Sequence, residues 1–162
     1  PRLSAWKAVW MNVLTPLFTT ECIALNSPAK NKDEVFAAAA TLFANQLDTI
    51  SADSVLSFLN AREQLGSTGL GAGLAIPHGR VKGLKHPCAA FITVANPIDF
   101  SAPDQLPVTI LVFLLVPEKA TQEHLEILSA IAQILSDPSA RAALKNEDDP
   151  EKVCQLLCQW KT

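Results

Sequence analysis

A nearly continuous apolar run, Val108 to Val116, restricts the possible folds more than any other part of the sequence. Pro107 and Pro117 bracket the run, and it is far shorter than the roughly 20 residues that a membrane-spanning helix needs. A strand that is apolar along its whole length has both faces covered by other elements. The segment Pro107 to Val116 therefore predicts a central strand in a sheet that is covered on both sides.

The rest of the chain supplies a second strand and several helices. Cys88 to Ala95 is rich in apolar and β-branched residues and predicts a strand, which the turn signal Asn96-Pro97 would end. Apolar residues at helical spacing predict helices over about 32–46, 51–64, 121–135, 138–144 and 149–160. The inward stripe of the helix that Thr121 would cap is expected to be Leu125, Leu128, Ile131, Ala132 and Leu135.

Helices before, between and after the strands, without an internal repeat, indicate an α/β protein. We expect a mixed β-sheet flanked by helices on both faces, in a single compact domain. The chain has 162 residues, of which 49% are hydrophobic, so a sizeable core can form without disulfides or a structural metal.

Charge and composition exclude several classes of function. The formal net charge is −3, and the lack of a basic stripe argues against binding to nucleic acid. No segment is suited to membrane insertion. The four cysteines lack a Cys-x-x-Cys spacing and the three histidines lack a metal-ligand spacing. We therefore expect a reduced, cytoplasmic protein that uses no metal and no cofactor.

The first 13 residues are set apart from the rest. Pro1 is not an initiator residue, and Met11 is the only methionine. The segment lacks the apolar region of a signal peptide, so we do not expect it to direct targeting. We interpret residues 1–13 as an N-terminal extension or a non-native remnant, and residues 14–162 as the functional domain.

All six glycines of the protein lie between Gly66 and Gly83. Glycine is common where the backbone turns tightly or approaches a ligand closely. A flexible linker is the alternative interpretation, but Leu70, Leu74 and Ile76 would then have no core to enter. The glycine-rich segment is therefore expected to be part of a binding site.

His78 lies in this segment and is its main chemical group, in a stretch that we predict to be a loop. Pro77 makes the approach to the histidine rigid, and Gly79 is expected to remove bulk and to turn a backbone amide toward an anion. Arg80 adds positive charge nearby. A neutral imidazole among such groups suits nucleophilic attack on phosphorus, whereas the alternative is a loop histidine without a role.

The segment from Glu63 through Leu70 to Gly79 resembles the phosphorylation-site signature of type-2 enzyme IIA domains. These domains belong to the bacterial phosphoenolpyruvate-dependent phosphotransferase system, in its fructose, mannitol and nitrogen-regulatory branch. The likeness covers most of the chain from about Leu14 onward. It also includes the segments 97–100, 107–117 and 124–128.

The resemblance implies a role for three residues. His78 would accept a phosphoryl group from the phosphohistidine of HPr or of its nitrogen-branch counterpart, beside a second histidine, His124, and an arginine, Arg62. Without the resemblance, we would interpret Arg62 as a solvated helix residue. His124 would be a half-buried histidine at the edge of the core. His86 has no counterpart in the family and is interpreted as a surface residue.

The resemblance is strongest to the nitrogen-regulatory members. We expect the chain to be a lone IIA domain, and its opening from Leu14 to Leu25 is similar to that group. Asn31 to Glu34 and Ser101 depart from the pattern. Membership would imply regulation of transporters or sensor proteins through the phosphorylation state. Two alternatives are a fructose- or mannitol-type IIA that passes the phosphoryl group to a IIB component, and a binding module that lacks the chemistry.

Overall fold

The protein folds around one mixed sheet with six strands in the part of the chain that this computed structural model describes. That part comprises residues 14, 17–119 and 122–160, and the side chains of residues 122–124 lie outside it. The strand order is β1-β5-β6-β3-β2, and β4 also pairs with β6. The strands are β1 (Ile23–Ser27), β2 (Gly69–Gly71), β3 (Leu74–Ala75), β4 (His78–Val81), β5 (Cys88–Ile98) and β6 (Val108–Pro117).

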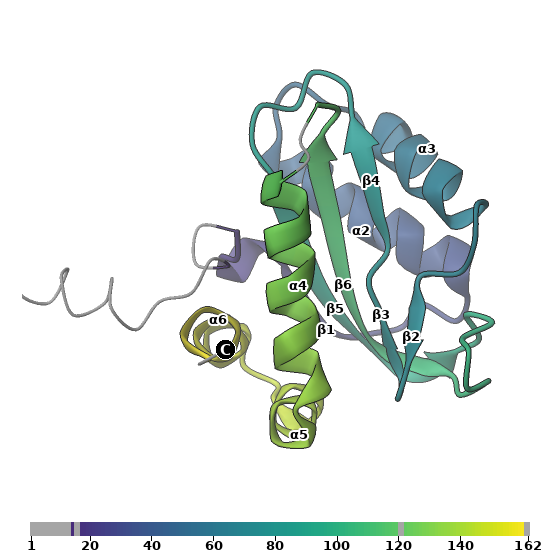
Figure 1. Cartoon of the computed structure of the whole chain (residues 1–162), viewed down its shortest axis with the longest axis vertical. Helices are drawn as coiled ribbons and strands as arrows, with labels where there is room; N and C mark the ends of the chain where they lie inside the picture. The colour runs from purple at the N-terminus through teal and green to yellow at the C-terminus, as the bar shows by residue number, and fades with distance from the viewer. Residues whose placement is uncertain (1–13, 15–16, 120–121, 161–162) are drawn as a thin grey trace, which may run out of the picture.

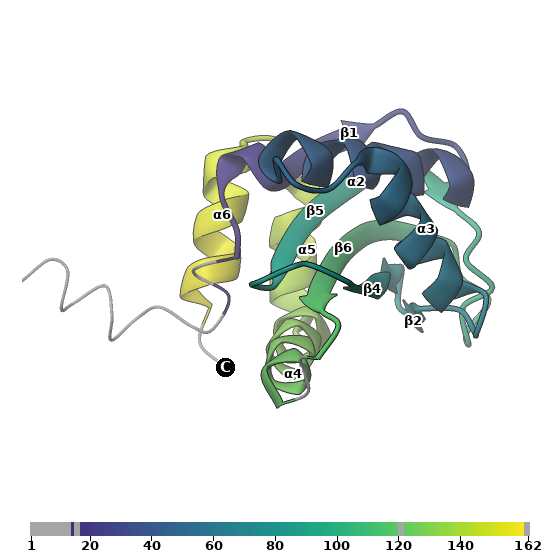
Figure 2. The ribbon, with the colours of Figure 1, turned by 90° about the horizontal axis from the view of Figure 1, so that it is seen from above.

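Helices cover both faces of this sheet, as the sequence predicts (Figures 1 and 2). They are α2 (Lys32–Gln46), α3 (Ala52–Glu63), α4 (Gln122–Ser136), α5 (Pro138–Asn146) and α6 (Pro150–Gln159), and a single 3-10 turn, η1 (Thr20–Cys22), precedes β1. Helices α2 and α3 lie on one face, and α4, α5 and α6 lie on the other. The α/β fold class and the helices of both layers are confirmed.

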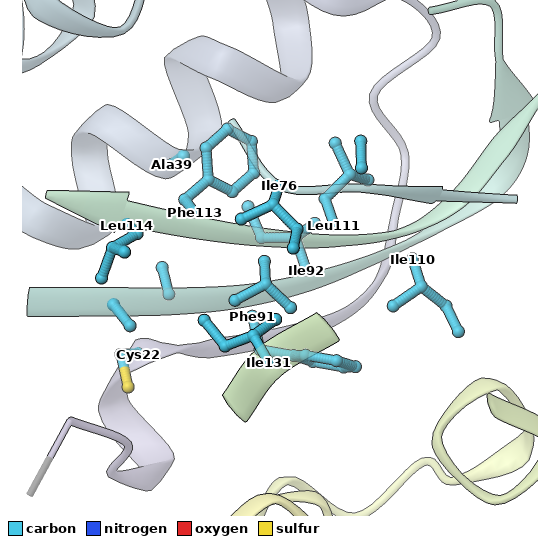
Figure 3. Packing of buried hydrophobic residues seen from close by; sticks show 14 of the residues in the cluster. Cys22, Ala39, Ile76, Phe91, Ile92, Ile110, Leu111, Phe113, Leu114 and Ile131 are labelled. Carbon is cyan, nitrogen blue, oxygen red and sulfur yellow. The ribbon is translucent and has the colours of Figure 1, made fainter. Parts of the chain in front are cut away.

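The apolar run forms the predicted central strand, β6. It pairs antiparallel with β5 and parallel with both β3 and β4. Phe113 points toward Ala39 of α2, whereas Phe91 and Ile131 lie on the opposite face (Figure 3). The rings of Phe36 and Phe113 meet edge-on at 5.5 Å between centroids. Both faces of the strand are therefore covered by packed apolar side chains.

The helix boundaries follow capping residues that are visible in the sequence. The Asn31 side chain accepts a hydrogen bond from the Glu34 amide, and the Ser51 side chain accepts one from the Ser54 amide. Asp137 caps α5 in the same way, and Asp149 caps α6. The predicted cap of α4, Thr121, lies outside the described residues.

Two predictions about these elements are wrong. Asn96 and Pro97 do not end the strand, since β5 continues to Ile98. The pairing of β5 with β6 shifts register between Thr93 and Ile98, and such an irregular stretch tolerates a proline that cannot donate to the ladder.

The expected inward stripe of α4 is also wrong in part. Leu125 is 61% exposed and Ala132 is exposed, whereas Leu128 is half-buried. The buried row consists of Ile127, Ala130, Ile131, Ile134 and Leu135. The helix thus has two apolar rows, of which one packs into the core and the other faces away from it.

No helix among the described residues is long and apolar enough to cross a membrane.

Candidate functional site

His78 lies at a break in the strand that runs beside β6. Both β3 and β4 pair with β6, and Ile76 and Pro77 separate them. The Pro77 carbonyl accepts a hydrogen bond from the Leu114 amide, at 3.0 Å, but proline has no N–H to donate. The Ile76 amide instead donates to the Thr68 carbonyl, at 3.1 Å. His78 is therefore the first residue of β4, and the prediction that it lies in a loop is wrong.

The imidazole of His78 is held by the backbone just before it. Its Nδ1 lies 2.9 Å from the Ile76 carbonyl oxygen, and a carbonyl can only accept a hydrogen bond. Nδ1 therefore carries the proton, and the neutral ring has its lone pair on Nε2. This is the tautomer in which Nε2 is the nucleophilic atom.

The surroundings of His78 favour this neutral ring. Partial burial lowers the pKa of His78 most strongly, and the hydrogen bond to Ile76 opposes that effect. The positive charge of Arg62 lowers the pKa further, Glu63 raises it, and Arg80 lowers it. The net shift is downward, so the ring is neutral near pH 7.

His78 opens into a surface hollow of about 250 Å³ that three parts of the chain form together. The end of α3, the glycine-rich segment and the middle of α4 meet there, and Figure 2 shows β4 between α3 and α4. The hollow is lined by Arg62, Ser67, Thr68, Gly69, Leu70, Ile76, His78, Leu128 and Ala132. A larger hollow, of about 570 Å³, lies between α5 and α6, but no histidine, cysteine or arginine lines it.

Arg62 comes from the last turn of α3 and points along the glycine-rich segment. Its Nη1 donates to the Gly66 carbonyl at 2.9 Å. A guanidinium has five N–H donors in a planar fork, so this contact orients the group while leaving its fork suited to phosphate oxygens. Arg62 thus lines the same hollow as His78.

Comparison with known proteins identifies the family of this chain. Residues 16–160 match the family described as "Phosphoenolpyruvate-dependent sugar phosphotransferase system, EIIA 2". The chain belongs to this type-2 enzyme IIA family. Such IIA proteins relay phosphoryl groups in the phosphotransferase system.

Individual relatives of this IIA chain include regulatory and sugar-specific proteins. It is 41% identical to a nitrogen regulatory protein of Pseudomonas aeruginosa, over 82% of this chain and 86% of that protein. It is 31% identical to a fructose-specific EIIA component of Haloferax volcanii, over 92% of this chain and 95% of that protein.

Solved structures agree with the fold. The crystal structure of the nitrogen regulatory protein IIA-Ntr from Neisseria meningitidis superposes with a TM-score of 0.86 at 40% identity, covering 90% of this chain and 99% of that one. The mannitol IIA of Escherichia coli has a TM-score of 0.73 at 22% identity, covering 86% of this chain and 98% of that one, and shares the fold.

The third predicted site residue, His124, belongs to the first turn of α4 in this IIA chain. Its side chain lies outside the described residues. Positions 124, 128 and 132 recur every four residues and so share one face of a helix. Of these positions, Leu128 and Ala132 line the hollow.

Gly79 provides space for a neighbouring helix. It is buried within β4, and a Cβ atom there would lie 3.0 Å from the Phe58 carbonyl oxygen. The glycine therefore lets α3 pack closely over β4, which sets the distance between the Arg62 helix and the His78 strand. The expected role of its amide as an anion ligand has no support from this placement.

Several residues of the hollow could not be assigned from the sequence. Leu128 and Ala132 belong to the apolar row that the sequence pattern assigns to the core. Thr68 is a buried polar residue, and nothing in its local sequence separates it from a turn threonine. Among the described residues, no group of three or more histidine, cysteine or acidic side chains is arranged to hold a metal ion.

Proposed function

We propose that this protein is a phosphoryl-relaying IIA protein that accepts a phosphoryl group on His78 from an HPr-like phosphocarrier. The hydrogen bond from His78 Nδ1 to the Ile76 carbonyl carries the proposal. It leaves the nucleophilic lone pair on Nε2, in a ring that lines the same hollow as Arg62. In the transfer the N–P bond of the carrier breaks, the Nε2–P bond forms, and the carrier's imidazole is the leaving group.

The same hydrogen bond suits the product of the transfer. A ring phosphorylated on Nε2 keeps one N–H, on Nδ1, which still donates to the Ile76 carbonyl. The acceptor can therefore gain and lose the phosphoryl group without changing its tautomer. Such a preorganised ring reduces the reorganisation that each transfer requires.

Arg62 supplies the positive charge that the transferred group needs. A phosphoryl group on histidine brings about two negative charges at neutral pH, and catalysis of its transfer depends mainly on positioning and electrostatic stabilisation. Each charge-assisted hydrogen bond from Arg62 would contribute about 1.5–3 kcal/mol. We propose that His124 supplies a further N–H donor from the first turn of α4.

Exposed leucines near the hollow favour a protein as the phosphoryl donor. Leu65 is 83% exposed and Leu70, which lines the hollow, is 50% exposed. Leu125 is 61% exposed on the α4 row that continues to Leu128. Exposed apolar side chains grouped on one surface are typical of a protein interaction site, and they fit a phosphocarrier that presents its own phosphohistidine.

We further propose that the protein works in the cytoplasm, in the nitrogen-regulatory branch, and that residues 14–162 form the active unit. The relatives at about 40% identity that carry the nitrogen regulatory name support this branch. The phosphorylation state would then control binding to transporters or sensor proteins, because two added charges change complementarity with a partner.

The test is phosphorylation with purified components. The protein is incubated with phosphoenolpyruvate, enzyme I and HPr, and its mass is measured before and after mild acid. We expect a gain of one phosphoryl group that acid removes and that His78→Gln abolishes. No gain would favour a binding module without the chemistry, and a gain in the His78→Gln variant would show that another residue is the acceptor.

The second candidate function is sugar uptake, in which the phosphoryl group passes to a cysteine of a IIB component. The fructose-specific relative of Haloferax volcanii favours it. Adding IIB components to the phosphorylated protein separates the two functions. Rapid discharge onto one of them would assign the protein to the sugar branch, whereas the nitrogen branch predicts slow discharge onto all of them.

A further inference from the structure

A charged pair behind the hollow links α2 and α3 to the glycine-rich segment. The Glu63 carboxylate lies 2.9 Å from the Lys32 ammonium, and the Glu63 side chain is only 9% exposed. The same carboxylate accepts two hydrogen bonds from Thr68, one from its amide at 3.1 Å and one from its hydroxyl at 2.5 Å. Lys32 also lies 4.7 Å from the centre of the Phe100 ring. This network consists of Lys32, Glu63 and Thr68.

Both charges occupy helix ends that disfavour them. Lys32 is the first residue of α2 and Glu63 is the last residue of α3. The helix dipole disfavours a cation at the N-terminus and an anion at the C-terminus. Each residue therefore breaks a local rule that α2 and α3 follow elsewhere through Asp33 and Asp53 in their first turns. Such violations concentrate at functional sites.

The network continues to the acceptor through the backbone. Thr68, held by Glu63, accepts the Ile76 amide on its carbonyl at 3.1 Å. Ile76 in turn accepts the proton of His78 Nδ1 on its own carbonyl, at 2.9 Å. Two residues, Thr68 and Ile76, thus connect the carboxylate to the imidazole through hydrogen bonds and their own backbone. It also acts through space, since its charge raises the pKa of His78 against the effects of burial and Arg62.

We propose that Glu63 is a positioning residue for the phosphoryl acceptor, which it orients through Thr68 and Ile76 with Lys32 as its counter-ion. The inference rests on the proposed role of His78. It adds the reason why the imidazole keeps one tautomer and one orientation. The alternative is that the network only joins α2 to α3. That alternative predicts a change in stability and no change at His78 in variants that fold.

The first test reads His78 directly in the unphosphorylated protein. Nitrogen-15 shifts of the ring report which nitrogen carries the proton, and a pH titration gives the pKa of His78 in the presence of Arg62, Glu63 and Arg80, the charges that act on it. In Glu63→Leu we expect a mixture of tautomers and a lower pKa. The control is Glu21→Gln, which changes an exposed carboxylate on η1 and is expected to match the wild type.

The second test is the rate of phosphoryl transfer from the carrier. The Glu63 side chain is only 9% exposed, so it is not expected to contact the carrier. We expect Glu63→Leu to lower kcat about tenfold, as a small misplacement of a reacting group does. KM for the carrier is expected to stay within about twofold, because the exposed leucines that would contact it are unchanged. Glu21→Gln is expected to keep kcat, whereas Thr68→Val, which removes the hydroxyl donor to Glu63, is expected to lower it.

The variant Glu63→Gln, which has the same shape, carries both tests if Glu63→Leu does not fold. A folded Glu63→Gln with the wild-type tautomer, pKa and kcat would overturn the inference. Failure of the inference about Glu63 is distinguishable from failure of the proposed function. If the wild type accepts no phosphoryl group, the proposed function fails, yet the tautomer measurement still decides whether Glu63 orients His78.

Discussion

At the scale of single residues, the site depends on where one proton lies. The Ile76 carbonyl fixes that proton on Nδ1 of His78, and burial and Arg62 keep the ring from gaining a second one. A histidine that was merely exposed would exchange between tautomers and would titrate near pH 6.5. The ring in this protein is prepared for attack through Nε2 before the carrier arrives.

The lowered pKa of His78 predicts how phosphoryl acceptance depends on pH. Only the neutral ring can attack, and a folded pKa below 6.5 means that the neutral form persists below the pH at which an ordinary histidine becomes protonated. We expect the single-turnover rate constant, measured with excess phosphorylated carrier, to stay constant from pH 8 to about 6.5 and to fall only at lower pH. A rate that already halves above pH 7 would contradict the shift.

Arg62 is predicted to contribute mainly to the transition state. We expect Arg62→Ala to lower kcat by about 10- to 100-fold, because one or two charge-assisted hydrogen bonds are lost. Arg62→Lys keeps the charge without the planar fork and is expected to recover part of the rate. The measurement is transfer from the carrier together with a thermal melt. An Arg62→Ala protein that unfolds would show instead that the arginine is needed for structure.

At the scale of secondary-structure elements, the sequence predicts long segments well and short ones poorly. The predicted helix over 32–46 coincides with α2, and β6 is one residue displaced from its prediction. Strands β2, β3 and β4 have two to four residues each, too few for a periodic pattern, and β1 was not predicted either. Strands β3 and β4 are positioned by pairing with β6, β2 by pairing with β3, and β1 by pairing with β5, and no local pattern encodes these partners.

The close packing of α3 over β4 gives a prediction at this scale. Gly79→Ala would place a Cβ 3.0 Å from the Phe58 carbonyl, so α3 must move. We expect a loss of about 1–3 kcal/mol in the free energy of unfolding, as in other overpacked sites, and slower phosphoryl transfer because Arg62 moves with α3. Urea unfolding measures the first effect. An unchanged midpoint would contradict the packing argument.

A matched substitution nearby is expected to change the free energy of unfolding in the opposite direction. Ala72 has a φ of 56°, in the left-handed region, and is exposed. Glycine adopts this region without strain, so Ala72→Gly is expected to increase the free energy of unfolding by about 1 kcal/mol. A loss of stability in Ala72→Gly would show that backbone strain is not the relevant quantity in this turn.

At the scale of the whole molecule, the sheet gathers residues that are far apart in sequence. Arg62 and Ala132 line one hollow although 70 positions separate them. His78 and Arg62 could be predicted because the family signature and its preceding helix contain them. The contributions of Thr68, Leu128 and Ala132 could not, since each depends on the packing of distant elements around β6.

Two buried cysteines, Cys22 and Cys158, are predicted to be unreactive in the folded protein. Burial raises the pKa of Cys22, and burial beside Cys154 raises the pKa of Cys158 to about 12. Only the thiolate reacts with alkylating reagents. We therefore expect Cys22 and Cys158 to resist iodoacetamide at pH 8 until the protein unfolds, as followed by mass spectrometry of peptides. Rapid labelling of either thiol in the native protein would contradict this packing.

The most direct test of His78 as the phosphoryl acceptor is to identify the atom that carries the phosphoryl group. The protein is labelled with nitrogen-15 and phosphorylated by phosphoenolpyruvate, enzyme I and HPr, and its ring nitrogens are observed by NMR with coupling to phosphorus. We expect Nε2 of His78 to couple to phosphorus while Nδ1 keeps its proton. Phosphorus coupled to Nδ1, or to any residue other than His78, would contradict it.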